Sequence, residues 1–183
     1  MKMIITLAMS LMATSALAAD NKLQDVLAAT PQLNKNCSAQ VIKSNRDEKT
    51  GKVETLILTA KHCVDGNGES EQIIEFPIYD KTRLVAKKEY IGMVKGMSYQ
   101  SDLAVISLKD TNTLFEKVVK LAPSELESKI GDPVITVGYP LGLSQTVTNG
   151  SFGSTEVIDW PKAGTEFYRA SPMIAGGNSG GVS

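Results

Sequence analysis

The chain has a single histidine, His62, and only two cysteines, Cys37 and Cys63, among its 183 residues. Because these three residues lack the tight ligand spacing of a zinc site, we expect neither a metal nor a cofactor. Aromatic residues make up 5% of the chain, the net charge is −1, and lysine and arginine form no run. The composition therefore excludes a basic surface for nucleic acid or for an anionic membrane. The sequence also contains no internal repeats and no low-complexity tract.

The chain has no apolar stretch long enough to span a bilayer, and its longest one lies at the N-terminus. Lys2 precedes the mostly apolar residues 3–13, and the small residues Ala16-Leu17-Ala18 follow. This order is typical of a cleaved secretory signal peptide, which we assign to residues 1–19, with Ala18 as the preferred cleavage position. An uncleaved anchor is the alternative. We therefore expect a periplasmic or secreted protein with no stable membrane anchor after cleavage.

About 165 residues remain after the signal, enough for one domain or two small ones. Since an exported chain leaves the reducing cytoplasm, we expect Cys37 and Cys63 to form a disulfide; two free buried thiols are the alternative. The disulfide would close a loop of about 26 residues, which is worth about 3.5 kcal/mol in the chain-entropy model.

Most of the remaining sequence consists of short strand-like segments separated by turn residues, a pattern typical of β-sandwiches and β-barrels. The expected strands are Ala39–Ser44, Val53–Ala60, Gln72–Ile78, Leu84–Val94 and Leu103–Leu108, then Pro133–Tyr139, Ser144–Thr148, Ser154–Ile158 and Glu166–Ala170. Asn149-Gly150 is expected to form a turn between two of these strands. Asp20–Thr30 is an expected helix, and Thr113–Leu121 is the one further candidate.

These segments divide the chain into five parts. The signal peptide (1–19) is followed by an N-terminal extension (20–36) and a first β-unit (37–110). A connector (111–130) then leads to a second β-unit (131–183).

A serine lies among glycines near the end of the sequence, in Gly177-Asn178-Ser179-Gly180-Gly181. A serine hydroxyl is a poor nucleophile until a base removes its proton during the attack. Glycines beside it leave room for a substrate and let backbone N–H groups turn inward, so those of Gly177 and Ser179 are candidates for an oxyanion hole. A plain glycine-rich turn is the alternative.

The base and the carboxylate that such a serine needs are also present. His62 lies at the end of an apolar segment, beside Cys63, whose disulfide would fix the backbone under the imidazole. Asp102 directly precedes the apolar run Leu103–Leu108. A carboxylate at the start of such a strand can reach an imidazole N–H and set the tautomer of the histidine. A packed core histidine and a turn-forming aspartate are the alternatives. The order His, Asp, Ser excludes the α/β-hydrolase arrangement, in which the histidine comes last.

Three motifs in the same order resemble those of the trypsin- and chymotrypsin-like serine endopeptidases. Thr59-Ala60-Lys61-His62-Cys63 is similar to the family's histidine motif, and Ser101-Asp102-Leu103-Ala104-Val105 to its aspartate motif. Gly177–Gly181 is similar to its serine motif, and Cys37 is placed like the first half of its histidine-loop disulfide. Val137–Gly142 and Thr146–Gly150 resemble the second barrel of exported bacterial HtrA/Deg-type relatives.

The resemblance implies an all-β fold of two antiparallel Greek-key barrels of the chymotrypsin-like type, with the active site in the cleft between them. It implies an exported serine endopeptidase that cleaves polypeptide substrates through an acyl-enzyme intermediate. His62, Asp102 and Ser179 would form the catalytic triad, and the N–H groups of Gly177 and Ser179 the oxyanion hole.

The resemblance also bears on specificity and activation. Met173 lies six residues before the serine, where the family has the floor of the P1 pocket, and Ile174 follows it. Because no acid is present there, we expect an apolar or small P1 side chain. Asn178 stands where trypsin-type zymogens have an aspartate, so we expect no activation by an ion pair with a freshly cut N-terminus.

Complete relatives continue for several strands past the serine, whereas this sequence ends at Ser183. We therefore expect the second barrel to be incomplete and to have an open edge. The sequence leaves open whether the chain is a fragment, whether a PDZ-like domain follows, and what the oligomeric state is. Two other functions also stay open: a binding or chaperone-like module with an incomplete triad, and a non-peptidase serine hydrolase such as an esterase.

Overall fold

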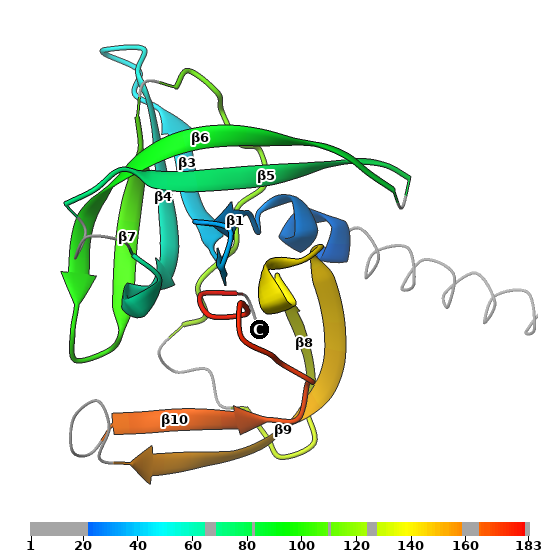
Figure 1. Cartoon of the computed structure of the whole chain (residues 1–183). Helices are drawn as coiled ribbons and strands as arrows, with labels where there is room; N and C mark the ends of the chain where they lie inside the picture. The colour runs from blue at the N-terminus through cyan, green and yellow to red at the C-terminus, as the bar shows by residue number, and fades with distance from the viewer. Residues whose placement is uncertain are drawn as a thin grey trace, which may run out of the picture.

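The computed structural model describes residues 22–64, 69–81, 83–109, 111–123, 128–158 and 165–181. Within these residues, ten strands form two antiparallel sheets, shown at the top and bottom of Figure 1. The predicted all-β class is therefore confirmed. The predicted signal peptide lies outside the described residues. None of the helices in the described part of the chain has the length and hydropathy of a membrane-spanning segment.

The first sheet has seven strands in the order β2-β1-β5-β6-β7-β4-β3 and curls into a half-barrel. Its strands are β1 (Gln32–Leu33), β2 (Cys37–Ser38), β3 (Gln40–Arg46), β4 (Val53–Ala60), β5 (Gln72–Asp80), β6 (Arg83–Ser98) and β7 (Leu103–Leu108). β7 pairs with both β4 and β6 and so joins the β3–β4 hairpin to the β5–β6 hairpin. This pairing brings the end of β4 beside the start of β7.

The core of the molecule lies inside the curl of the first sheet. Alternate residues of β4 and β7 are buried, as the period of two along a strand requires. Ile57, Ile74 and Ile106, from three different strands, have no exposed surface. Phe76 stacks on Phe115 with ring centroids 4.6 Å apart, and the edge of Tyr90 completes an aromatic cluster beside them.

The candidate helix at Thr113–Leu121 is wrong, because residues 111–123 have no helical structure. The backbone N–H of Val119 donates to the carbonyl of Val41, and that of Phe115 donates to the Ser44 hydroxyl. These donors are bonded to β3 and are thus unavailable for the i−4 carbonyls of a helix. Burial of Phe115 in the aromatic cluster holds the segment in this extended path.

The second sheet has three strands among the described residues, in the order β10-β9-β8. These are β8 (Pro133–Gly138), β9 (Thr146–Ile158) and β10 (Thr165–Ala170), and the 3-10 turn η3 (Pro140–Gly142) follows β8. Val137, Tyr139 and Phe152 are its buried apolar residues, whereas Ile135, Val157 and Tyr168 are exposed.

The expected turn at Asn149-Gly150 is also wrong, because β9 runs through it. Asn149 pairs with Ile135 and Gly150 pairs with Val134 on the neighbouring strand. Gly150 is needed there for space: a side chain at this position would collide with the backbone between Ser171 and Pro172. The glycine thus marks a close approach of the segment that leads to Ser179.

The helix at residues 22–28 lies between the two sheets in Figure 1 and falls within the predicted Asp20–Thr30. The Gln145 side-chain amide donates to the carbonyls of Leu27 and Thr30 near the end of this helix. The Tyr139 hydroxyl donates to the Thr30 carbonyl as well, and burial raises the pKa of Tyr139, so it stays a neutral donor. β1 lies within the predicted N-terminal extension but belongs to the first sheet.

Candidate active site

His62 and Asp102 meet at one end of the first sheet. His62 lies in the 3-10 turn η1 (Lys61–Cys63) that follows β4, and Asp102 directly precedes β7. Pairing of Ala60 with Leu103 brings the two segments together. The His62 Nδ1 atom lies 2.6 Å from Asp102 Oδ2, and the backbone N–H of His62 donates to Asp102 Oδ1 at 3.0 Å.

The backbone around Asp102 is shaped for these contacts. Asp102 has φ +50°, in the left-handed region, and its carbonyl accepts the N–H of Lys61 at 2.8 Å. Aspartate and asparagine tolerate this conformation better than other residues with side chains. A carboxylate at Nδ1 keeps the proton on that nitrogen, so the lone pair on Nε2 is free to act as a base. The His62 side chain is 56% exposed, which leaves it accessible to a substrate.

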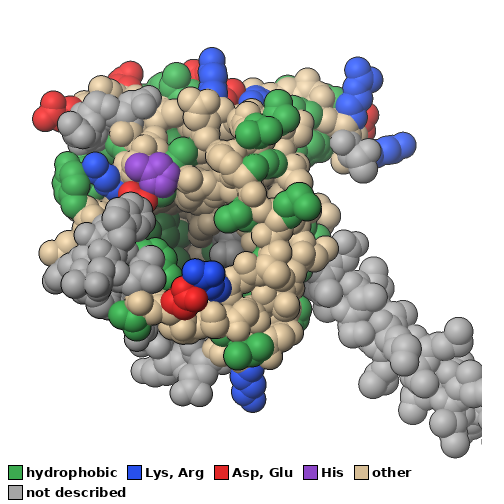
Figure 2. Space-filling view, turned by 60° about the horizontal axis from the view of Figure 1, so that its bottom comes forward, with side chains coloured by type: hydrophobic (Ala, Val, Ile, Leu, Met, Phe, Trp, Pro, Cys, Tyr) green, Lys and Arg blue, Asp and Glu red, His purple; other side chains and the backbone are tan. Residues whose placement is uncertain are grey.

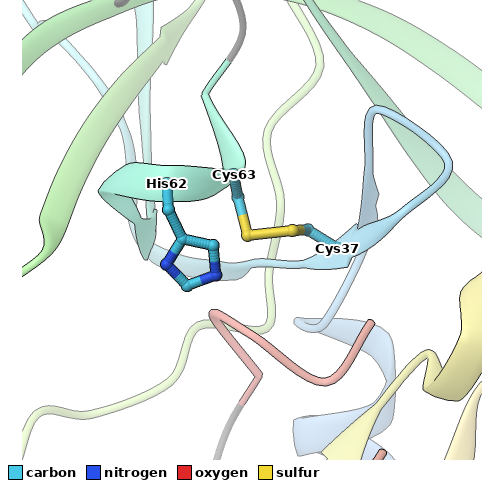
Figure 3. A group of neighbouring side chains, drawn as sticks. All are labelled: Cys37, His62 and Cys63. Carbon is cyan, nitrogen blue, oxygen red and sulfur yellow. A yellow bond between two sulfur atoms is a disulfide. The ribbon is translucent and has the colours of Figure 1, made fainter. Parts of the chain in front are cut away.

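A disulfide between Cys37 and Cys63 lies beside the imidazole, as Figure 3 shows. The Cα atoms of the two cysteines are 6.0 Å apart, and both residues are buried. The disulfide ties η1 to β2 and therefore helps to hold the histidine backbone. Among the described residues, Cys37, His62 and Cys63 form the one group with metal-ligand chemistry, but oxidised sulfurs offer no thiolate.

The loop that contains Ser179 is attached to the first sheet mainly through Ser38 of β2. The backbone N–H of Ser38 donates to the carbonyl of Ser179 at 2.9 Å. The Ser38 hydroxyl donates to the carbonyl of Gly177 at 2.8 Å and accepts the N–H of Tyr139 at 2.9 Å. One buried hydroxyl thus joins β2, the end of β8 and the serine loop.

Gln40 and Thr59 complete this attachment, which we call the seam. The Gln40 amide donates to the carbonyls of Gly180 and Gly181, and the Thr59 hydroxyl donates to the carbonyl of Ser38. Gly180 has φ +78°, and a Cβ there would collide with the Ser38 carbonyl and the Thr59 hydroxyl. Glycine is therefore required at this position for both conformation and space.

The loop leaves backbone donors near the serine without a partner among the described residues. The N–H of Asn178 donates to Ala175 and that of Gly181 to Asn178, whereas those of Gly177 and Ser179 make no hydrogen bond within the described part of the chain. Gly177 has φ +99°, and a side chain there would collide with the Tyr139 carbonyl. Free neighbouring N–H groups are the donors that an oxyanion hole requires. The Ser179 hydroxyl also makes no hydrogen bond among the described residues.

The chain's only histidine lies at the rim of a hollow in the face shown in Figure 2. Met173 and Ile174, the expected pocket residues, are 82% and 67% exposed. The amide oxygen of Asn178 is buried and has no hydrogen-bond partner among the described residues. A side chain at Gly138 would collide with that oxygen.

The structure brings His62 and Asp102 into contact and attaches the loop that contains Ser179 to the same sheet. Sequence reasoning did not predict the seam that makes this attachment. Ser38 follows Cys37 directly and belongs to no recognisable sequence motif. Its hydroxyl donates to Gly177, about 140 positions away in the sequence. A buried serine at this place in β2 is a long-range feature that no local motif reports. Its effect is to position the serine loop beside the disulfide, where the Ser179 carbonyl lies 3.8 Å from Cys63 Sγ.

Comparisons with known proteins agree with this geometry. The family model for the trypsin-like peptidase domain matches residues 37–182. A probable periplasmic serine protease of the do/HhoA-like type from Haemophilus influenzae is 30% identical over 128 residues, which cover 69% of this chain and 25% of that protein. The periplasmic serine endoprotease DegP of Salmonella typhimurium is 29% identical over 127 residues, 69% of this chain and 24% of that protein.

Among solved structures, that of Deg5 has a TM-score of 0.65 at 19% identity and covers 91% of this chain and 78% of its own. At this identity the likeness concerns the fold alone. The chain spans about a quarter of the length of the curated relatives named above. The predicted resemblance to HtrA-type proteins is confirmed, and the chain belongs to the trypsin-like peptidase domain family.

Proposed function

We propose that this chain is an exported serine endopeptidase with His62, Asp102 and Ser179 as its catalytic triad. The observation that carries the proposal is the 2.6 Å contact between His62 Nδ1 and Asp102 Oδ2, at a site to which the seam anchors the serine loop. Such a pair has a free Nε2 base, and the loop supplies the nucleophile and the N–H groups of Gly177 and Ser179. The names of the relatives, which are periplasmic serine proteases, support export and peptide substrates.

In the proposed mechanism, Ser179 Oγ attacks the scissile carbonyl while Nε2 of His62 takes its proton. The negative charge on the carbonyl oxygen is stabilised by the N–H groups of Gly177 and Ser179. Asp102 stabilises the imidazolium, which then protonates the leaving amine, and a water molecule hydrolyses the acyl-enzyme. The hydrogen bond between Ser179 and His62 forms when substrate binds, since such contacts are often long in free enzymes.

The exposed Met173 and Ile174 support an apolar or small P1 preference, because they present apolar surface beside the serine loop. Asn178 is uncharged and cannot form an ion pair with a freshly cut N-terminus, which supports a site that needs no zymogen-type activation. Peptides that differ only in P1, with alanine, valine, leucine or arginine, test the preference. We expect the arginine peptide to be the poorest substrate.

Labelling with a fluorophosphonate tests the triad itself. The purified protein should form a covalent adduct at Ser179 that is absent in Ser179→Ala and in His62→Ala. As the control, circular dichroism should show that both variants are folded like the wild type. A folded wild-type protein that is not labelled would contradict the proposal and favour a binding module of the same fold. Hydrolysis of ester but not of amide substrates would favour an esterase.

A further inference from the structure

We propose that reduction of the Cys37–Cys63 disulfide creates a metal site in which the two thiolates and His62 bind Zn²⁺. The two sulfur atoms and a ring nitrogen of His62 lie within 4.8 Å of one another, as Figure 3 illustrates. Tetrahedral zinc, with bonds of about 2.3 Å to sulfur and about 2.0 Å to nitrogen, places such ligands roughly 3.5–3.8 Å apart. Small side-chain rotations reach that spacing once the S–S bond is broken.

Both cysteines are held in place by contacts that do not depend on the disulfide. On one side, Leu33 pairs with Cys37, and the next residue, Ser38, is fixed by the seam. On the other side, the side-chain amide of Asn34 donates to the carbonyl of Cys63 at 3.1 Å. The thiols therefore stay close together after reduction, so the ligands are largely preorganised for a metal.

The surroundings of His62 are those of a zinc ligand. A zinc-bound histidine almost always donates its other ring N–H to a carboxylate, a backbone carbonyl or water, and this contact orients the ring and raises its basicity. Asp102 provides this contact at Nδ1, and Nε2 is left for the metal. Two cysteines, one histidine and a water molecule also form an established zinc coordination set. The exposed side of the imidazole gives an ion access from solvent.

The chemistry requires a reductant, for which a water-soluble tertiary phosphine is suitable. The phosphine is oxidised to its oxide with oxygen from water, the S–S bond breaks, and each sulfur receives a proton. Zn²⁺ then displaces both thiol protons to the buffer and accepts an electron pair from each sulfur and from Nε2. This consequence rests on the proposed function: zinc binds the Nε2 lone pair of His62 that would accept the Ser179 proton. The metal-bound protein is therefore inactive as a peptidase.

Cobalt is the probe, because thiolate-to-cobalt absorption reports sulfur ligands directly. The full chain is reduced with phosphine, and the phosphine is then removed under anaerobic conditions. The reduced protein is titrated with Co²⁺, and Zn²⁺ is added last to displace the bound cobalt. We expect one Co²⁺ per chain with thiolate absorption, and none with the unreduced protein. The double variant Cys37→Ser/Cys63→Ser should show no such absorption, and its circular dichroism shows whether the fold survives without the disulfide.

Two further variants separate the metal site from catalysis. Asp102→Asn should weaken cobalt binding by about 10- to 100-fold. Ser179→Ala should bind cobalt like the wild type although it cannot be labelled. The proposal would be overturned if the reduced chain showed no thiolate-to-cobalt absorption, whether or not the chain is folded when the metal is added. It would also be overturned if His62→Ala bound cobalt as tightly as the wild type. Absent labelling of the oxidised protein would count against the proposed function alone.

Discussion

The two sheets differ in how completely they bury their apolar side chains. In the first sheet, Ile57, Ile74 and Ile106 are fully buried in a core that also contains the aromatic cluster and the disulfide. In the second sheet, Val137 and Phe152 are buried, but Ile135 is 44% exposed. Since burial of apolar surface is the main favourable term in folding, the first sheet provides most of the stability of the described molecule.

This difference separates the candidate active site into two halves. His62 and Asp102 are positioned by the β4–β7 pairing and by the core beneath it. Ser179 belongs to the sparsely packed half and depends on the seam around Ser38 for its place. Changes in the first half should therefore alter catalysis or global stability, whereas changes in the seam should alter the position of the nucleophile.

The largest effect is expected from Asp102→Asn, which tests the first half by chemistry alone. Asparagine tolerates the φ of +50° at this position, and its oxygen can still accept the His62 N–H. It cannot stabilise the imidazolium or keep the correct tautomer, so we expect peptidase turnover to fall about 10⁴-fold. Stability in urea should be nearly unchanged. A loss of activity below tenfold would remove Asp102 from the mechanism.

A matched pair of isoleucine-to-alanine variants measures the difference between the sheets directly. Ile106→Ala leaves a cavity in the packed core of β7 and should lower the free energy of unfolding by about 2–5 kcal/mol. Ile135→Ala removes a partly exposed side chain of β8 and should cost less than about 1 kcal/mol. Urea unfolding followed by circular dichroism gives both values. Equal losses would show that the second sheet contributes as much as the first.

Ser38→Ala tests the seam. The variant leaves the N–H of Tyr139 and the carbonyl of Gly177 without their buried partner, which should cost about 1–3 kcal/mol. Because the serine loop is then less well held, the fluorophosphonate labelling rate should fall at least about tenfold, as a shift of about 1.4 kcal/mol would give.

The matched control is Ser44→Ala in β3 of the same sheet. The Ser44 hydroxyl contacts Thr55 and accepts the N–H of Phe115, remote from the serine loop. This variant should lose stability but keep its labelling rate. If both variants were labelled at the wild-type rate, the seam would be structural only.

The parts of the structure that the sequence predicted are those governed by local patterns. The alternating residues of β4 and β7 and the three motifs each depend on a few neighbouring positions, and both sheets were expected from them. The motifs also gave the order of His62, Asp102 and Ser179, and the structure brings the first two into contact.

The errors have a common physical cause, which is contact with distant segments. Residues 113–121 look amphipathic, but their donors bond to β3 and Phe115 packs in the core. Asn149-Gly150 resembles a turn, but β8 pairs through it and residues 171–172 pack on the glycine. Ser38 has no local signal, because its partners are brought to it only by the fold.

The smallest effect concerns the ion pairs on the outside of the first sheet. Glu54 of β4 contacts Lys43 of β3 and Lys95 of β6, each at 2.7 Å. Hydrogen bonds from Lys43 and then from Lys95 lower the pKa of Glu54 from its usual 4.5 to about 2. A lowered pKa in the folded state favours folding above pH 4.5, and this contribution is lost as the pH falls towards 2.

Glu54→Gln should therefore reduce stability slightly at pH 7 and leave it equal to that of the wild type near pH 2. Because the pairs are exposed, the difference at pH 7 should be small and should shrink further in about 1 M salt. Urea unfolding of both proteins from neutral to acidic pH measures it. A difference that grew as the pH fell would show that Glu54 is not stabilised in its charged form, and the first sheet's advantage would then lie in its core alone.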